Sequence, residues 1–159
     1  MDRFEIGVHI VTLAAAFALA VPIGWDREKR ARSAGLRTFP LVAMASCGFI
    51  QASETLLAGT PDGLSKVIEG LITGIGFIGG GAILKQGTTV QGTATAASLW
   101  ATGAIGVSVG LGSYDVAVTI ALFTFLTLRF MTLVKEDDDV TDGGSKNRGD
   151  EKEIRDKKD

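Results

Sequence analysis

The most chemically loaded part of this chain is a short charged segment between two apolar runs. Residues 24–38 read Gly-Trp-Asp-Arg-Glu-Lys-Arg-Ala-Arg-Ser-Ala-Gly-Leu-Arg-Thr, so carboxylates are mixed with arginines. Arginine presents a planar fork that pairs with carboxylate or phosphate oxygens. The segment is therefore either a basic anchor for anionic lipid headgroups or a defined turn that holds a shielded ion pair. Composition alone does not choose between the two.

An ion pair within this segment would have a structural use. Asp26 and Arg27 lie directly at the edge of the first apolar run, and Gly35-Leu36 before Arg37 is typical of a defined turn. We expect Asp26 to pair with an arginine of the same segment, with Arg37 as the first candidate. Such a pair would hold the ends of the first two helices together, because a desolvated charge is costly without its partner.

A second polar pattern lies on an apolar helix further along. Thr95, Ser98 and Thr102 are spaced i, i+3 and i+7, which predicts one polar stripe on a helix. Such hydroxyls either bond to a neighbouring helix or to their own carbonyls, or they line a solvated cavity. We expect Trp100 to serve packing rather than to stack on a ligand. An adjoining face is kept small by Ala94, Ala97 and Ala101.

The glycine-rich stretch contains a misleading motif. Gly74-x-Gly76-x-x-Gly79 matches the dinucleotide fingerprint, but its flanks are apolar on both sides and no acidic residue stands about twenty positions on. We reject nucleotide binding. Gly70 and Gly74, and separately Gly76 and Gly80, are four apart, which predicts close helix packing on two faces. One contact should lie within the subunit, and the other is a candidate for a contact between subunits.

Other chemistry is sparse in this sequence. The chain has one cysteine, Cys47, and one histidine, His9, which gives no internal disulfide and no Cys/His metal box. We expect both to serve helix packing. No nucleophile and base pair stands out, so we expect a protein that is not an enzyme and has no cofactor. Residues 1–134 hold nine basic and eight acidic residues, a balance that does not suggest nucleic acid binding.

The elements around these residues must be membrane helices. Between Gly70 and Leu128 the chain carries only two charged residues, Lys85 and Asp115. A bilayer requires about twenty apolar residues per crossing and tolerates glycine where helices touch. The sequence therefore predicts an all-α integral membrane protein.

Hydrophobic runs predict about five crossings, a turn over 59–63 and a polar loop over 85–91. The first run contains Ala18-Leu19-Ala20, which resembles a signal-peptide cleavage site, but Asp2 and Glu5 cancel the usual basic start, so we expect a retained helix. The third run could be short, tilted or broken at its glycines. The expected crossings are 6–25, 39–58, 67–84, 93–111 and 116–134.

Basic residues give the expected orientation. Five of them fall in the 27–37 segment, against Lys66 alone between the second and third crossings, so that segment should be cytoplasmic. The N-terminus is then outside, while Lys85 and the C-terminus are inside. Residues 135–159 hold ten acidic and seven basic residues, and we expect this tail to be disordered. The predicted domains are 1–134 and 135–159.

Four of these patterns occur together in one known family. The segments Gly24-Trp25-Asp26-Arg27, Ala34-Gly35-Leu36-Arg37-Thr38, Thr73-Gly74-Ile75-Gly76-Phe77-Ile78-Gly79-Gly80-Gly81 and Thr95-Ala96-Ala97-Ser98-Leu99-Trp100 stand in family-like order. Over residues 6–134 the chain resembles the membrane domain of the MgtC/SapB family. Asp26 stands where that family usually has Glu, which shortens the reach of the carboxylate.

The resemblance implies a multi-pass protein of the cytoplasmic membrane of a prokaryote. It implies a link to growth in low magnesium, and to virulence or intracellular survival in pathogens, through control of other membrane machinery. Many members carry a cytoplasmic ACT-like domain after the last helix, whereas here a short charged tail follows. The motif positions of interest are Asp26, Arg27, Arg32, Gly35, Arg37, Thr38, Gly74, Gly76, Gly79, Lys85, Thr95, Ser98 and Trp100.

Two functions remain open at this point. The first is a non-enzymatic regulator that contacts other membrane proteins and forms homo-oligomers. The alternative is a transporter or channel for magnesium or another ion, a label that family members also carry. Magnesium prefers charged oxygen ligands, and residues 70–114 contain no carboxylate, so we expect the regulator.

Overall fold

The computed structural model describes residues 6–30, 34–57 and 60–130. The chain divides into two compact units, Met1–Phe125 and Leu126–Asp159, and the described part of the second is the short helical stretch 126–130. The predicted tail, 135–159, lies outside the described residues.

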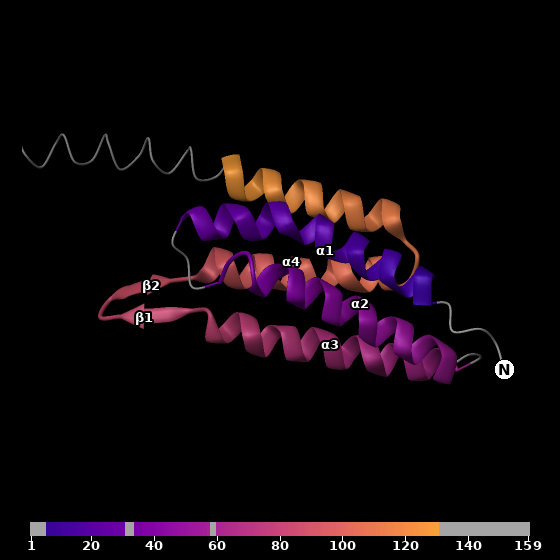
Figure 1. The fold of residues 1–159 in the computed structure, drawn as a ribbon. Coiled ribbons are helices and arrows are strands. Elements are labelled where there is room, and N and C mark those ends of the chain that lie inside the picture. The colour runs from indigo at the N-terminus through magenta and orange to yellow at the C-terminus, as the bar shows by residue number, and fades with distance from the viewer. Residues whose placement is uncertain (1–5, 31–33, 58–59, 131–159) are drawn as a thin grey trace, which may run out of the picture. The chain divides into compact units, whose positions relative to one another are not determined.

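The first unit is built from helices and one short hairpin (Figure 1). A last helical stretch covers residues 114–130, and Phe130 is the last residue that the structure describes. The predicted all-α character is confirmed, apart from the hairpin. The labelled elements are α1 (Ile6–Lys29), α2 (Thr38–Leu56), α3 (Pro61–Gly81), β1 (Leu84–Gln86), β2 (Thr89–Gln91) and α4 (Thr93–Gly110).

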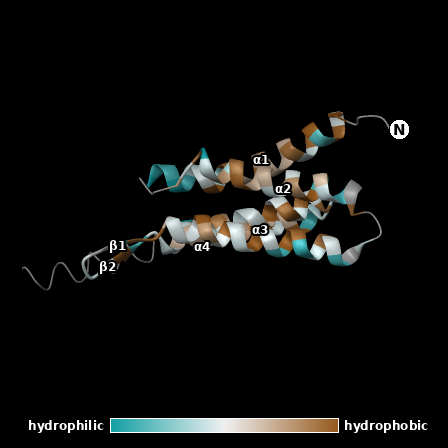
Figure 2. Cartoon of the chain, turned by 90° about the horizontal axis from the view of Figure 1, so that it is seen from below, coloured by the Kyte–Doolittle hydropathy of each residue, from teal (hydrophilic) through white to brown (hydrophobic). Residues whose placement is uncertain are grey.

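Helix α1 is longer than its apolar run. It continues past Trp25 to Lys29 because the charged residues of its last turn interact with one another along the helix. Among the described residues, α1 is the one helix that is both long and apolar enough to cross a membrane. The apolar colour of its first turns gives way to hydrophilic colour at its C-terminal end (Figure 2).

Helix α3 begins earlier than the sequence indicated. The turn predicted over 59–63 was wrong in its second half, because Pro61 starts the helix and Thr60 precedes it. Proline suits the first helical position, where its missing N–H would be unpaired in any case, and Asp62 in the first turn interacts favourably with the helix dipole. The helix ends at Gly81 rather than near residue 84.

The polar loop predicted over 85–91 was also wrong, since these residues form most of a hairpin. Strands β1 and β2 are antiparallel, with Lys85 opposite Val90. Gly87 begins the two-residue turn with a φ of 59°, the left-handed region that glycine favours in hairpins. At Gly92, φ is 90° and a side chain would collide with the Ala82 carbonyl, which closes the base of the hairpin tightly.

Helices α2 and α4 are the central elements of the first unit. Helix α4 packs against α1, α2 and α3, and α2 also packs against α1 and α3. The interior is made of small and medium apolar side chains with few aromatics, which lets the helices lie close together. Fully buried side chains include Ile23 on α1, Phe39 and Ile50 on α2, and Leu99, Ile105 and Val109 on α4.

Many large apolar side chains lie on the outside of the described helices. Phe77 on α3 is 86% exposed, and large apolar side chains on the other helices are exposed as well. Soluble monomers rarely expose apolar surface on this scale. Other examples are Val11, Phe17, Leu41, Phe49, Leu122 and Phe123.

Candidate functional site

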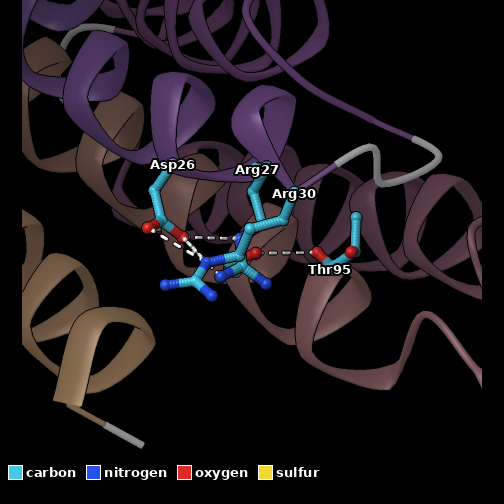
Figure 3. Close-up of polar contacts among 5 residues, drawn as sticks. Asp26, Arg27, Arg30 and Thr95 are labelled. Atoms are coloured by element: carbon cyan, nitrogen blue, oxygen red, sulfur yellow. Dashed lines mark hydrogen bonds and ion pairs between the residues drawn. The ribbon is translucent and has the colours of Figure 1, made fainter. Parts of the chain in front are cut away.

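The charged end of α1 contains a buried ion-pair cluster. Asp26 and Arg27 are only 5% and 3% exposed. Arg27 donates from Nε to Asp26 Oδ2 at 3.2 Å, and Arg30 donates from Nε to Asp26 Oδ1 at 3.3 Å. Figure 3 shows these side chains extending from α1 toward the turn of α4 that carries Thr95. One carboxylate therefore serves two guanidinium groups.

The shielded ion pair was predicted correctly, but its partner was not. Arg37 is exposed and stands just before α2, whereas Arg27 lies on the same helix as Asp26 and Arg30 follows that helix directly. Pairing of Asp26 with these nearby arginines does not require a loop to be ordered, so it costs less conformational entropy than pairing with Arg37. Arg32, another candidate, lies outside the described residues. The pair consequently organises the end of α1 and does not connect α1 to α2.

The connection between α1 and α2 is made by other groups. The Glu28 carboxylate accepts a hydrogen bond from the Leu36 backbone N–H at 3.1 Å. The Gly35 carbonyl accepts from the N–H groups of Thr38 at 3.0 Å and Phe39 at 3.2 Å, which starts α2. The defined turn predicted at Gly35-Leu36 is thus confirmed.

Two glycines make this junction possible. A Cβ on Gly24 would lie 3.3 Å from the Gly35 carbonyl oxygen, and a Cβ on Gly35 would collide with the Glu28 carboxylate. The sequence reading missed Glu28. The available signal was the pair of glycines that flank the charged segment, since they mark where backbone approaches closely.

The hydroxyl stripe on α4 is confirmed as a buried feature. Thr95, Ser98 and Thr102 are between 0% and 3% exposed. Ser98 Oγ donates to the Thr95 carbonyl at 2.9 Å, and Thr102 Oγ1 donates to the Ser98 carbonyl at 2.8 Å. Both hydroxyls therefore satisfy themselves on their own helix, as one of the two interpretations expected.

The glycines of α3 are mostly not where the helices touch. A Cβ on Gly74 or Gly76 would meet nothing within 4 Å, and the same holds for Gly70 and Gly80. The close packing predicted for these four within the subunit was wrong; a contact between subunits stays a prediction. Gly79 does pack closely, since its Cβ would lie 3.3 Å from the Ala96 carbonyl oxygen.

The close approach instead occurs at α4. Side chains on Gly103 and Gly106 would collide with Ile75 on α3 and with the Ala43 carbonyl on α2, respectively. A Cβ on Gly110 would lie 2.8 Å from Ile50 Cβ. The sequence reading missed this face, although Gly106 and Gly110 are four apart and carry the same small-residue signal.

The remaining predicted residues are spread over the surface. Lys85 is exposed on β1, and Thr38 is half-buried at the start of α2. Trp100, expected to serve packing, is 52% exposed. The described residues contain no group of three or more His, Cys, Asp and Glu side chains that could hold a metal ion.

The second notable site is a groove between α2 and α3 with a volume of about 620 Å³. Leu41, Ala45 and Phe49 line it from α2, while Gly70, Gly74 and Ile78 line it from α3. Arg37 and Thr38 stand at one end. None of the hydroxyls of α4 named above contributes to it.

These features define a class: helical proteins with apolar outer surfaces and a buried ion-pair cluster at one end of a helix. The comparisons with known proteins are more specific. The profile of the MgtC family matches residues 13–136, and the chain belongs to that family. The resemblance inferred from the four motifs is confirmed, and MgtC family proteins are membrane proteins.

Several relatives are similar over most of the described helices. Protein MgtC of Salmonella typhimurium strain LT2 is 40% identical over 121 residues, which cover 76% of this chain and 51% of the relative. Protein MgtC of Brucella abortus is 41% identical over 111 residues, covering 70% and 46%. Protein SrpB of Synechococcus elongatus is 36% identical over 128 residues, covering 73% and 70%.

The chain spans about half the length of the MgtC relatives that it matches. No solved structure showed a significant match to the chain.

Proposed function

We propose that this chain is a non-enzymatic, multi-pass protein of the cytoplasmic membrane that regulates other membrane proteins during adaptation to low magnesium. In this proposal the five helical stretches cross the bilayer, the N-terminus is outside, and the β1–β2 hairpin is cytoplasmic. The proposal rests on family membership for the magnesium link and on the arrangement of polar groups for the mode of action.

The membrane placement is supported by the outer surface. Large apolar side chains such as Phe77 and Phe123 are exposed on the described helices, where lipid would cover them. The charged residues of α1 gather at the end toward which the hairpin also lies (Figure 1). At that end Lys29 Nζ lies 5.1 Å from the centre of the Trp25 ring, a pairing suited to a membrane interface.

The observation that carries the regulatory role is that polar groups inside the helix bundle are satisfied by the chain itself. Among the described residues, no buried side-chain nitrogen or oxygen lacks a hydrogen-bond partner. Ser98 and Thr102 bond to carbonyls of their own helix, and Asp26 is neutralised by arginines. An ion path would need oxygen ligands directed at the ion, because a divalent cation releases its waters reluctantly.

Magnesium flux decides between regulation and transport. We would reconstitute the purified chain in vesicles loaded with a magnesium-sensitive dye, impose a gradient, and compare the flux with that of a known magnesium channel. In parallel, the chain would be expressed in a strain that lacks its own copy and grows poorly in low magnesium. We expect restored growth without flux above that of empty vesicles.

A matched variant separates the two mechanisms further. Thr102→Val removes the hydroxyl nearest the middle of α4 and keeps the shape of the side chain. Flux that this variant abolishes, together with loss of growth, would replace the proposal with a carrier. Growth without flux, in both wild type and variant, supports action on a partner protein.

A further inference from the structure

The groove between α2 and α3 has an unusual cause. Its floor is formed where side chains are missing: a Cβ on Gly70 or Gly74 would meet nothing within 4 Å, and Ala45 faces the same space. The two helices therefore touch without filling the gap between them. The lining is almost entirely apolar, so in water this surface would be costly to leave open.

The two ends of the groove differ in polarity. Helices α2 and α3 run in opposite directions (Figure 1), so Arg37 and Ile78 lie at one end while Phe49 and Val67 lie at the other. Arg37 is exposed and forms no ion pair with any residue that the structure describes. The α2–α3 groove is thus apolar along its length and has the Arg37 cation at one end.

The length of the groove is also informative. Twelve residues separate Arg37 from Phe49, which corresponds to about 18 Å at the rise of an α-helix. One leaflet of the hydrocarbon core is about 15 Å deep, half of a core of about 30 Å. A phospholipid chain in the same leaflet therefore matches both the length and the apolar lining of the groove.

We propose that the α2–α3 groove binds one acyl chain of an anionic phospholipid, with the lipid phosphate paired to Arg37. The inference rests on the proposed membrane placement, which puts Arg37 at the cytoplasmic interface. The guanidinium fork fits phosphate oxygens in two parallel hydrogen bonds, and the exposed side chain of Arg37 is free to adopt that geometry. The volume of about 620 Å³ lies in the range of pockets that hold one small apolar ligand.

Native mass spectrometry of the full chain tests this site. The purified protein would be mixed in detergent with equal amounts of phosphatidylglycerol and phosphatidylcholine that carry the same acyl chains. We expect one phosphatidylglycerol to be retained per chain, in preference to phosphatidylcholine. Arg37→Gln should reduce that preference about five-fold, the effect of one basic residue at an anionic headgroup.

Matched variants distinguish the groove from the general surface. Gly74→Leu fills the groove and should reduce retention of both lipids, with Gly70→Leu as a second variant at another open position. Gly76→Leu is equally unobstructed but does not line the groove, and Lys85→Gln removes an exposed cation on β1. Both of these controls should retain lipid like the wild type.

The outcomes separate the two proposals. The groove assignment is overturned if the wild type retains no lipid. It is also overturned if Arg37→Gln, Gly70→Leu and Gly74→Leu all retain lipid like the wild type. If a dimer is detected without bound lipid and Gly74→Leu abolishes the dimer, the groove binds a second copy of the chain. That result also overturns the lipid assignment. Failure of the chain to sediment with cell membranes is instead a failure of the proposed function, and it is measured independently by fractionation.

Discussion

The carboxylate of Glu28 on α1 accepts a hydrogen bond from the backbone N–H of Leu36, eight residues further along and two residues before α2 begins. This contact joins the ends of the first two helices over a segment rich in arginine. It also places a negative charge beside Gly35, where a larger residue would collide with it. The junction is therefore held by one exposed carboxylate and by the absence of a side chain opposite.

Removal of Glu28 should loosen this junction. Glu28→Ala is expected to lower the free energy of unfolding by about 0.5 to 1 kcal/mol, because the hydrogen bond is exposed to solvent. Glu28→Gln retains an acceptor oxygen and should cost less than half as much. Unfolding in mixed micelles, followed by circular dichroism, measures both. Equal losses in the two variants would show that charge, rather than the hydrogen bond, matters here.

The buried carboxylate of α1 should be more costly to remove. Asp26→Asn leaves the guanidinium of Arg27, only 3% exposed, without its counter-charge, and we expect a loss of about 3 to 5 kcal/mol. Asp115→Asn, an exposed position in the first turn of the helical stretch 114–130, is the control and should change stability by no more than about 0.5 kcal/mol. Thermal unfolding in detergent compares the two. Similar melting temperatures for both variants would contradict a shielded cluster.

Two glycine positions should respond in opposite ways. Gly106→Ala drives a methyl group into the Ala43 carbonyl of α2 and should destabilise the protein by about 1 to 3 kcal/mol. Gly76→Ala meets nothing within 4 Å and should leave stability unchanged or raise it, by about 1 kcal/mol at most. If Gly76→Ala proves the more damaging change, the open face of α3 is covered in the membrane, by a second copy or a partner.

Cysteine labelling in intact cells tests the orientation. In a Cys47→Ala background, we would place single cysteines at Thr60, before α3, and at Thr88, in the hairpin; both positions are exposed. The five basic residues of the 27–37 segment predict that an impermeant reagent labels position 60 and spares position 88 until the cells are permeabilised. The reverse pattern would invert the proposed topology.

Sequence alone located the helices well because each needs a long apolar run, whatever its neighbours. Their ends were less predictable, since α1 is extended by ion pairs and α3 by Pro61. The hairpin was missed because strands of three residues are too short to show alternation.

The candidate site shows a different limit. That Asp26 would be shielded followed from its place beside an apolar run, but spacing did not rank its possible partners. Likewise, small residues on a helix indicate that another helix packs closely against it, but they do not identify which helix that is. The same four-residue spacing occurs at Gly70 and Gly74, which face an open groove, and at Gly106 and Gly110, which touch α2.

Cys47 has a practical consequence. It is the single cysteine of the chain and is fully buried on α2, at the face where its carbonyl would lie 3.1 Å from a Cβ on Gly110 of α4. A thiol reagent can reach it only when the packing around this part of α2 opens. The rate at which the unmodified protein reacts with a thiol reagent therefore measures how often the helix packing around Cys47 opens, and a ligand that stabilises this packing will slow the reaction.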